Sequence, residues 1–233
     1  MLFKDYMFWD ALKNTVIYWI TGVILILALG LLISGLLNYN RLRGRAFFKS
    51  ATYLPNICAV IAMGIIFSML FEKNTGLINE VIFAMGANKV DWLTGTRFSK
   101  IPVIALNVWR NTPWFTMILL SGLLNISPEY YEAAKVDGAN AFQRFFKITL
   151  PSLSNVMFFC FITLTADSWK IFNEPFMLQG PGTSNVSLFQ YMYESGFNVF
   201  KLGYASSIGC MLTLILLIVS VIQFIIRMKQ GEV

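Results

Sequence analysis

Three uncharged, apolar segments are each long enough to cross a lipid bilayer, which restricts the folds open to this chain. They contain 23, 20 and 22 residues and cover 15–37, 52–71 and 205–226. A membrane-spanning α-helix needs about 20 mostly apolar residues. Two further segments of similar length carry internal charges, namely 101–124 and 153–177. The sequence therefore predicts an all-α integral membrane protein with five transmembrane helices in a single domain, 1–233.

The composition agrees with this prediction and argues against other classes of protein. Hydrophobic residues make up 57% of the chain and charged residues 13%, against about 25% charged residues in a soluble domain. The net charge is +6, but the basic residues cluster in short loops between spans, which favours a membrane protein over a nucleic-acid-binding one. The chain has no histidine and no CxxC pair. We therefore predict neither a metal site nor a cofactor.

The basic residues also predict an orientation. Three stretches on one side of the predicted spans are basic, and they contain Arg41, Arg43, Arg45, Lys49, Lys135, Arg144, Lys147, Arg227 and Lys229. The positive-inside rule makes that side, and with it the C-terminus, cytoplasmic. Five spans then place the N-terminus outside, which is unusual without a preceding span. We expect that one N-terminal helix is missing or that the start at Met1 is misassigned.

The segment 128–151 is longer than most connections between helices, and it is patterned. Ser127 suits an N-cap, Pro128 suits the first helical position, and Gly138 suits a left-handed C-cap. A second amphipathic helix follows, whose shared face carries Phe142, Phe145, Phe146 and Thr149. Two interpretations remain open at this point: a helix lying among lipid head groups, or a surface on which another protein docks.

The same segment resembles the EAA loop of ABC-transporter permeases. The fixed positions all match in spacing, and the predicted coupling residues are Glu132, Ala133, Ala134, Asp137, Gly138, Ile148, Leu150 and Pro151. Residues 126–139, 180–184 and 202–206 resemble the carbohydrate (maltose-type) branch of these permeases. The resemblance implies the fold of a type I ABC importer, with this loop forming coupling helices seated in a cleft of the ATPase. Gln179 departs from the branch, where a second glycine is common.

The resemblance also implies partners and a location. A second, related permease would complete the pathway, two ATPase subunits would bind below, and an extracellular solute-binding protein would deliver the ligand at a bacterial inner membrane. The chain has no G-x-x-x-x-G-K-[ST] phosphate loop, so we do not expect it to be an enzyme. The expected cargo is a sugar. The alternatives are glycerol phosphate or another polyol derivative, and a membrane scaffold or sensor without transport.

Charged and aromatic residues inside two spans are candidates for the substrate pathway: Arg110, Asp167, Trp169, Lys170 and Asn173. Ionisable groups within a span are costly and usually face the bundle or water. A sugar pathway combines aromatic faces with amide and carboxylate groups. Arg110 has the alternative of extending outward to the interface. Asp167 and Lys170 have the alternative of forming a structural salt bridge at the outer end of their helix.

Overall fold

The computed structural model describes residues 2–39, 44–229 and 231, and every regular element in these ranges is helical. The first half contains the 3-10 helix η1 and five α-helices: η1 Leu2–Lys4, α1 Tyr6–Leu37, α2 Arg45–Ile57, α3 Val60–Leu70, α4 Leu77–Ala84 and α5 Lys100–Leu124. The second half adds seven α-helices and two π-helices, η2 and η3: α6 Pro128–Val136, α7 Ala141–Arg144, η2 Phe145–Thr149, α8 Leu150–Ser152, α9 Ser154–Trp169, α10 Asn173–Met177, α11 Leu188–Tyr193, η3 Glu194–Asn198 and α12 Leu202–Lys229.

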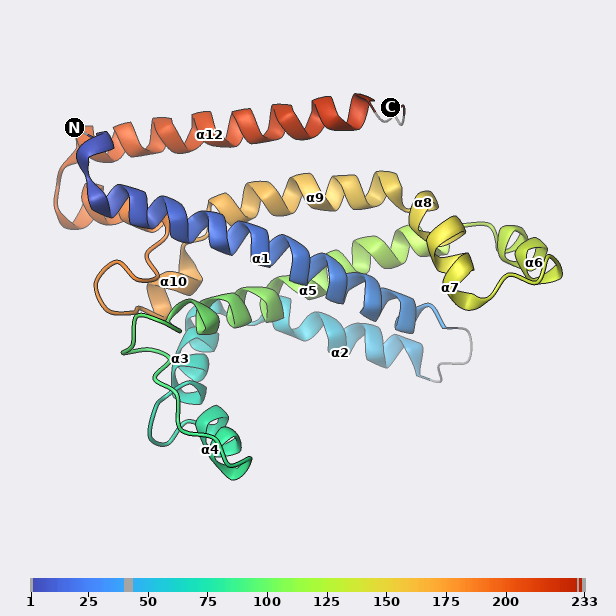
Figure 1. The fold of residues 1–233 in the computed structure, drawn as a ribbon, viewed down its shortest axis with the longest axis horizontal. Coiled ribbons are helices and arrows are strands. Elements are labelled where there is room, and N and C mark those ends of the chain that lie inside the picture. Colours follow the sequence, from blue (N-terminus) through green and yellow to red (C-terminus); the bar gives the residue numbers. More distant parts are fainter. Residues whose placement is uncertain (1, 40–43, 230, 232–233) are drawn as a thin grey trace.

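Four long helices, α1, α5, α9 and α12, run along the long axis of the molecule (Figure 1). The central one is α5, which packs against α1, α2, α3, α9 and α10 and has 13 of its 25 residues buried. In contrast, α12 lies at the edge against α9 and α11, with five of its 28 residues buried. At about 1.5 Å per residue α5 is about 37 Å long, which exceeds the hydrocarbon core of a bilayer.

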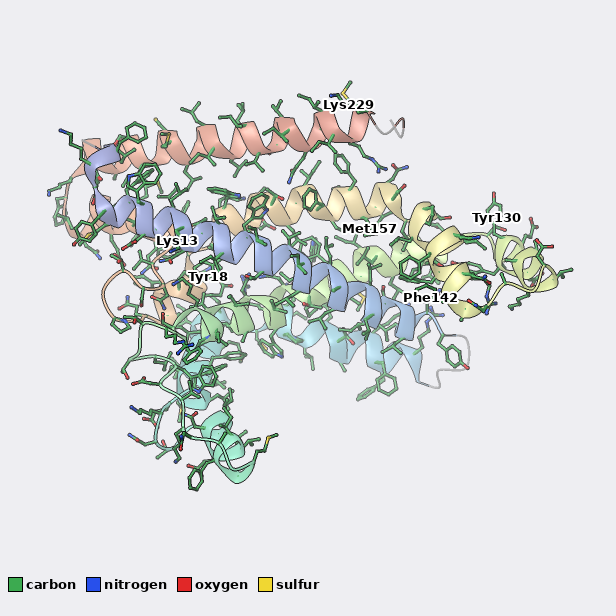
Figure 2. The ribbon with its side chains drawn as sticks, viewed as in Figure 1. Lys13, Tyr18, Tyr130, Phe142, Met157 and Lys229 are labelled. Atoms are coloured by element: carbon green, nitrogen blue, oxygen red, sulfur yellow. The ribbon has the colours of Figure 1, made fainter. Side chains whose placement is uncertain are left out.

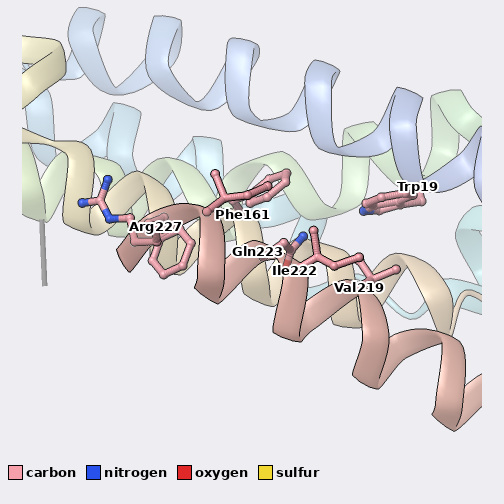
Figure 3. A pocket seen from close by; sticks show the side chains of 8 residues that line it. Trp19, Phe161, Val219, Ile222, Gln223 and Arg227 are labelled. Atoms are coloured by element: carbon pink, nitrogen blue, oxygen red, sulfur yellow. The ribbon is translucent and has the colours of Figure 1, made fainter. Parts of the chain in front are cut away.

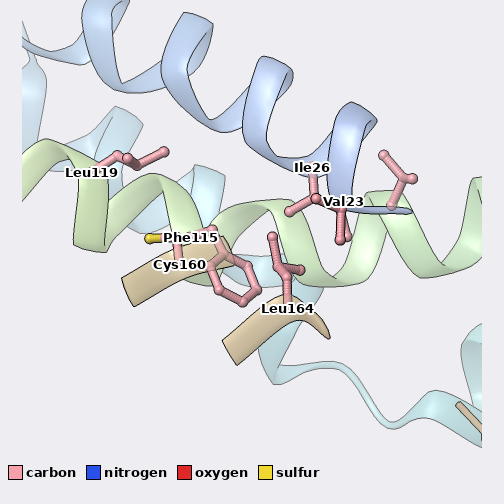
Figure 4. Close-up of a cluster of buried hydrophobic side chains, with 7 residues drawn as sticks. Val23, Ile26, Phe115, Leu119, Cys160 and Leu164 are labelled. Atoms are coloured by element: carbon pink, nitrogen blue, oxygen red, sulfur yellow. The ribbon is translucent and has the colours of Figure 1, made fainter. Parts of the chain in front are cut away.

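The largest apolar core lies where α1, α5 and α9 meet (Figure 4). Val23 and Ile26 of α1 contact Phe115 and Leu119 of α5, and α9 adds Cys160 and Leu164. Gly30 allows the close approach of α1 and α5, since a Cβ there would lie 3.2 Å from Leu119 Cδ1. Cys160 is fully buried, as expected for a small apolar residue.

The outer faces of the helices remain apolar and exposed, as lipid-facing surfaces are. On α12, for example, seven large apolar side chains are 47–56% exposed: Leu214, Leu217, Ile218, Val221, Ile222, Phe224 and Ile225. Within the described residues, α1 and α12 are each long and apolar enough to cross a membrane. The number of candidate spans rises to four if each of two bent helix pairs is taken as one span.

The prediction of one continuous helix over 52–71 is wrong. The chain bends by 90° between α2 and α3, where Cys58 and Ala59 adopt extended backbone conformations. Pro55 weakens the last turn of α2, because it has no N–H to donate to the carbonyl four residues earlier. After the bend α3 packs on α10, so closely that a Cβ on Gly64 would lie 2.6 Å from Met177 Cβ.

The prediction of one helix over 153–177 is also wrong. Helix α9 ends at Trp169, and the short α10 begins only at Asn173. The break follows from Pro175, which cannot donate a hydrogen bond to the carbonyl of Ile171 and would clash with it in a continuous helix. Ser187 Oγ donates to that carbonyl instead, at 2.5 Å. The other predicted spans each lie inside one helix: α1, α5 and α12.

The two ends of the bundle carry different segments of the chain. The 128–151 segment and the C-terminal end of α12 lie at the same end, opposite the start of α1 (Figure 1). The labelled Tyr130 and Phe142 mark the first end, and Lys13 and Tyr18 lie toward the other (Figure 2). This matches the sequence prediction that these basic stretches share one side. Arg41 and Arg43 fall outside the described residues.

Candidate functional site

A cavity of about 320 Å³ lies among α1, α5, α9 and α10. Four of the five predicted pathway residues line it, although they come from different helices: Arg110, Asp167, Lys170 and Asn173. Its volume falls in the range of small-molecule sites, which is about 300–1,000 Å³. Charged and amide side chains from different parts of the bundle therefore converge on one hollow.

Arg110 faces the bundle and pairs with a carboxylate from the far side of the helix break. Its Nε lies 3.2 Å from Glu174 Oε1, and the side chains are 24% and 5% exposed. The Arg110 carbonyl accepts a hydrogen bond from Asn56 of α2, at 3.2 Å. In an unbroken helix Glu174 would continue the face of Asp167 and Lys170, but the helix is interrupted at 170–172 and Glu174 pairs with Arg110 of α5 instead.

Asp167 and Lys170 form a second ion pair on the rim of the cavity, with 3.6 Å between Asp167 Oδ1 and Lys170 Nζ. Their side chains are 60% and 52% exposed. The sequence left open whether these residues form a structural salt bridge or line the pathway. In the structure they form a salt bridge at the end of α9 and also line the cavity. In total, the cavity wall carries two positive and two negative groups, each within 4 Å of an opposite charge.

Trp169 is separated from the other four candidates. It is 2% exposed, and its ring centroid lies 5.9 Å from that of Trp19 on α1. Phe172 supplies an aromatic side chain to the cavity wall in its place.

Several lining residues were missed by the sequence prediction, among them Asn107, Asn111, Ser168 and Phe172. Asn111 Nδ2 donates to Asn107 Oδ1 at 2.6 Å, one helical turn away. The spacing of Asn107, Arg110 and Asn111 places all three on one face of α5, which is a signal that the sequence contains. Amides in an apolar span indicate a polar interior face as clearly as charges do.

A second cavity, of about 420 Å³, lies between α9 and α12 (Figure 3). Its wall is mainly apolar and aromatic, with Trp19, Phe158, Phe161, Val219, Ile222 and Ile226. Gln223 donates to Thr165 Oγ1 at 2.8 Å, and Arg227 donates to Asn155 Oδ1 at 2.7 Å. These hydrogen bonds tie α12 to α9, and the cavity offers few polar groups to a hydrophilic solute.

The 128–151 segment folds into two helical arms around Gly138, as the sequence predicted. Ser127 accepts a hydrogen bond from the backbone N–H of Glu129 at the start of α6, and Gly138 adopts a left-handed backbone with φ +76°. The second arm consists of α7, η2 and α8. It begins with a capping box that the prediction overlooked, in which Asn140 and Gln143 exchange side-chain and backbone hydrogen bonds.

Large apolar and aromatic side chains are exposed on both arms. Phe142, Val136 and Tyr130 are 71%, 88% and 63% exposed. The eight predicted coupling residues are distributed over the two arms, and all of them are exposed at least in part. Glu132 lines a hollow of about 570 Å³, and a second hollow of about 440 Å³ is lined by Ala134, Asp137, Gly138 and Ile148. Leu150 and Pro151 lie in α8, where the chain turns into α9.

Residues 26–230 match the family described as "binding-protein-dependent transport system inner membrane component". The chain belongs to this family. Membership of this family makes the chain a membrane subunit of a transport system. The 128–151 segment and the polar cavity both lie within the matched range.

Curated relatives of this inner membrane component include sugar permeases. The chain is 31% identical to the lactose transport system permease of Rhizobium radiobacter, over 96% of this chain and 77% of the relative. It is 33% identical to the trehalose/maltose transport system permease of Thermococcus litoralis, over 97% and 75%. Among solved structures, a bacterial alginate ABC importer matches with a TM-score of 0.87 at 21% identity, over 98% of this chain and 81% of that one. The fold is therefore that of ABC importer permeases.

Proposed function

We propose that this chain is the permease subunit of an ATP-driven ABC importer and forms half of the pathway for a neutral carbohydrate. The observation that carries the proposal is the polar cavity between α5 and α9–α10. Its amides and Phe172 provide the hydroxyl-binding and stacking groups that a sugar needs. Relatives named for lactose and for trehalose/maltose transport support this cargo class.

The charge balance of the cavity favours a neutral sugar over glycerol phosphate. A phosphate needs unpaired cationic groups, usually arginine or lysine. Here Arg110 is matched by Glu174, and Lys170 by Asp167. This half of the pathway therefore has no surplus positive charge for an anionic substrate.

The proposal includes the arrangement in the membrane. The single permease domain crosses the bacterial inner membrane five times, through α1, α2–α3, α5, α9–α10 and α12, with the C-terminus in the cytoplasm. A second permease pairs with it, and two ATPase subunits bind below, where the 128–151 segment of this chain docks on an ATPase. An extracellular solute-binding protein delivers the sugar. The alginate importer, whose solved complex includes a periplasmic protein bound to alginate pentasaccharide, supports this last partner. Transport follows alternating access.

Glu132 tests the coupling role. It is exposed on α6 and available to pair with a basic residue of the ATPase. We expect Glu132→Lys to abolish transport in proteoliposomes while the protein still inserts into the membrane. Glu129→Lys is the matched control, with the same charge change on the same exposed helix, and should retain transport. Full transport by Glu132→Lys, with the ATPase still bound, contradicts the coupling role.

Asn173 tests the cargo. We expect Asn173→Ala to weaken the stimulation of ATPase activity by sugar-loaded binding protein, measured with lactose, maltose, trehalose and glycerol 3-phosphate as candidate ligands. If the dependence on substrate is unchanged in this variant, Asn173 has a structural role only. If glycerol 3-phosphate alone stimulates the wild type, the neutral-sugar assignment is wrong.

A further inference from the structure

The two arms of the 128–151 segment are joined by a side-chain hydrogen bond far from their glycine hinge. Tyr131 lies on α6, and its hydroxyl is 2.9 Å from Oγ1 of Thr149, the last residue of η2. Thr149 Oγ1 in turn donates to the Arg144 carbonyl, at 3.5 Å. A threonine hydroxyl has only one proton to donate. Tyr131 is therefore the donor to Thr149, and the two bonds connect α6 to the first residue before the π-helix.

This contact is sheltered in a segment that is otherwise open. Thr149 is 8% exposed, whereas its neighbours Phe145 and Phe146 are 38% and 48% exposed. A hydrogen bond shielded from water is stronger than one at the surface, and leaving one of its partners unpaired is costly. The bond is thus suited to hold a fixed geometry.

The turn at 137–140 also connects the arms. Ala139 N donates to the Ala134 carbonyl at 2.8 Å, and a Cβ added to Gly138 would meet no atom within 4 Å. A turn of this kind fixes the path of the backbone but resists bending only weakly. The Tyr131–Thr149 hydrogen bond joins the arms at a second point, away from Gly138.

The second arm joins α9 at a bend of 66°, and α9 in turn reaches the substrate cavity. Thr149 is followed by α8 and then by α9, whose 16 residues span about 24 Å. Asp167 and Ser168, near the end of α9, line the cavity. A π-helix within a helical segment often marks a functional site, and η2 lies at the base of this connection.

We propose that Tyr131 and Thr149 are positioning residues that lock α6 to the arm leading into α9. Movement imposed on α6 then reaches the cavity as a displacement of α9, rather than being absorbed at Gly138. The inference rests on the proposed function, because it assumes that a partner ATPase moves α6. It assigns roles to two side chains outside the EAA positions.

The test uses the complete importer in lipid nanodiscs and proteoliposomes. Tyr131→Phe and Thr149→Val each remove one hydroxyl and keep the shape of the side chain, while Tyr130→Phe is the matched control on the exposed side of α6. We expect either variant to lower the sugar transported per ATP hydrolysed by about two- to tenfold, the equivalent of one net hydrogen bond. The double variant should be no worse than the more affected single one, since both remove the same bond. Thr149→Ser keeps the hydroxyl and should behave as wild type.

A spectroscopic readout separates coupling from general damage. Spin labels at Lys135→Cys and Lys147→Cys, with the native cysteines replaced by serine, report the distance between the arms. Tyr131→Phe should broaden the distribution of distances without changing the affinity for the ATPase. Wild-type coupling and an unchanged distribution in both Tyr131→Phe and Thr149→Val overturn the inference. If Glu132→Lys also transports normally, the proposed coupling function fails instead.

Discussion

The two ion pairs of the cavity should contribute very different amounts to stability. Arg110→Ala leaves Glu174, which is 5% exposed, without its partner at 3.2 Å. The attraction between unit charges at this distance is about 5 kcal/mol at an effective dielectric constant of 20, and the cost of desolvating Arg110 cancels part of it. Removing one member of a buried pair costs about 3–5 kcal/mol. We expect Arg110→Ala to lose stability in this range.

Thermal unfolding in detergent, followed by tryptophan fluorescence, measures the effect. For a chain of this size about 2–4 °C of Tm corresponds to 1 kcal/mol, so the expected drop is about 6–20 °C. Lys170→Ala is the control on the exposed pair, where we expect a loss below about 1 kcal/mol. The double variant Arg110→Met with Glu174→Met should recover most of the stability, because no buried charge is left unpaired. A Tm for Arg110→Ala equal to that of Lys170→Ala refutes the reasoning.

Three further predictions concern the ends of the bundle. Asn79 is fully buried, its Nδ2 lies within 3.3 Å of three backbone carbonyls, and its Oδ1 accepts two hydrogen bonds. Asn79→Ala should therefore speed limited proteolysis within 72–99 by at least about tenfold. Burial raises the pKa of Asp5, but hydrogen bonds from two tyrosine hydroxyls and the backbone outweigh it and hold this pKa below its usual value. The carboxylate of Asp5 therefore contributes fully to stability above about pH 4, and this contribution is lost as the pH falls below that value. Between neutral and acid pH, the Tm of Asp5→Asn should fall less steeply than the Tm of the wild type. Gly138→Ala imposes a left-handed backbone on alanine, at a cost of about 1–2 kcal/mol, and should lower transport about five- to thirtyfold at unchanged membrane insertion; wild-type transport contradicts the hinge.

Most of the helical architecture follows from local sequence signals. The uncharged runs gave α1 and α12, and the sequence Ser127–Pro128 marked the start of α6 because a hydroxyl cap and a proline both suit a helix N-terminus. Gly138 was identified as the left-handed position that ends this helix. These features depend on neighbouring residues alone, and a single sequence therefore contains them.

The helix breaks were missed because they depend on partners distant in the sequence. Length and apolar composition predict one span for such a segment, whether or not the helix bends within it. Extended backbone at Cys58 is tolerated because α3 finds a close packing partner in α10, through Gly64 and Met177. The partner comes from more than 100 residues further along the chain, and no periodicity in the first segment indicates it.

The cavity arises from one of these breaks. In a continuous helix Glu174 would lie two turns beyond Asp167 on nearly the same face. Pro175 interrupts the helix, Ser187 satisfies the freed carbonyl of Ile171, and Glu174 turns inward to within 3.2 Å of Arg110. The charged residues were chosen as candidates from their cost inside a membrane, and Arg110, Asp167 and Lys170 line the cavity. The pairing of Arg110 with Glu174 could not be predicted from the sequence. It depends on the helix break before Pro175, where the Ile171 carbonyl accepts a hydrogen bond from Ser187, sixteen residues further along the chain.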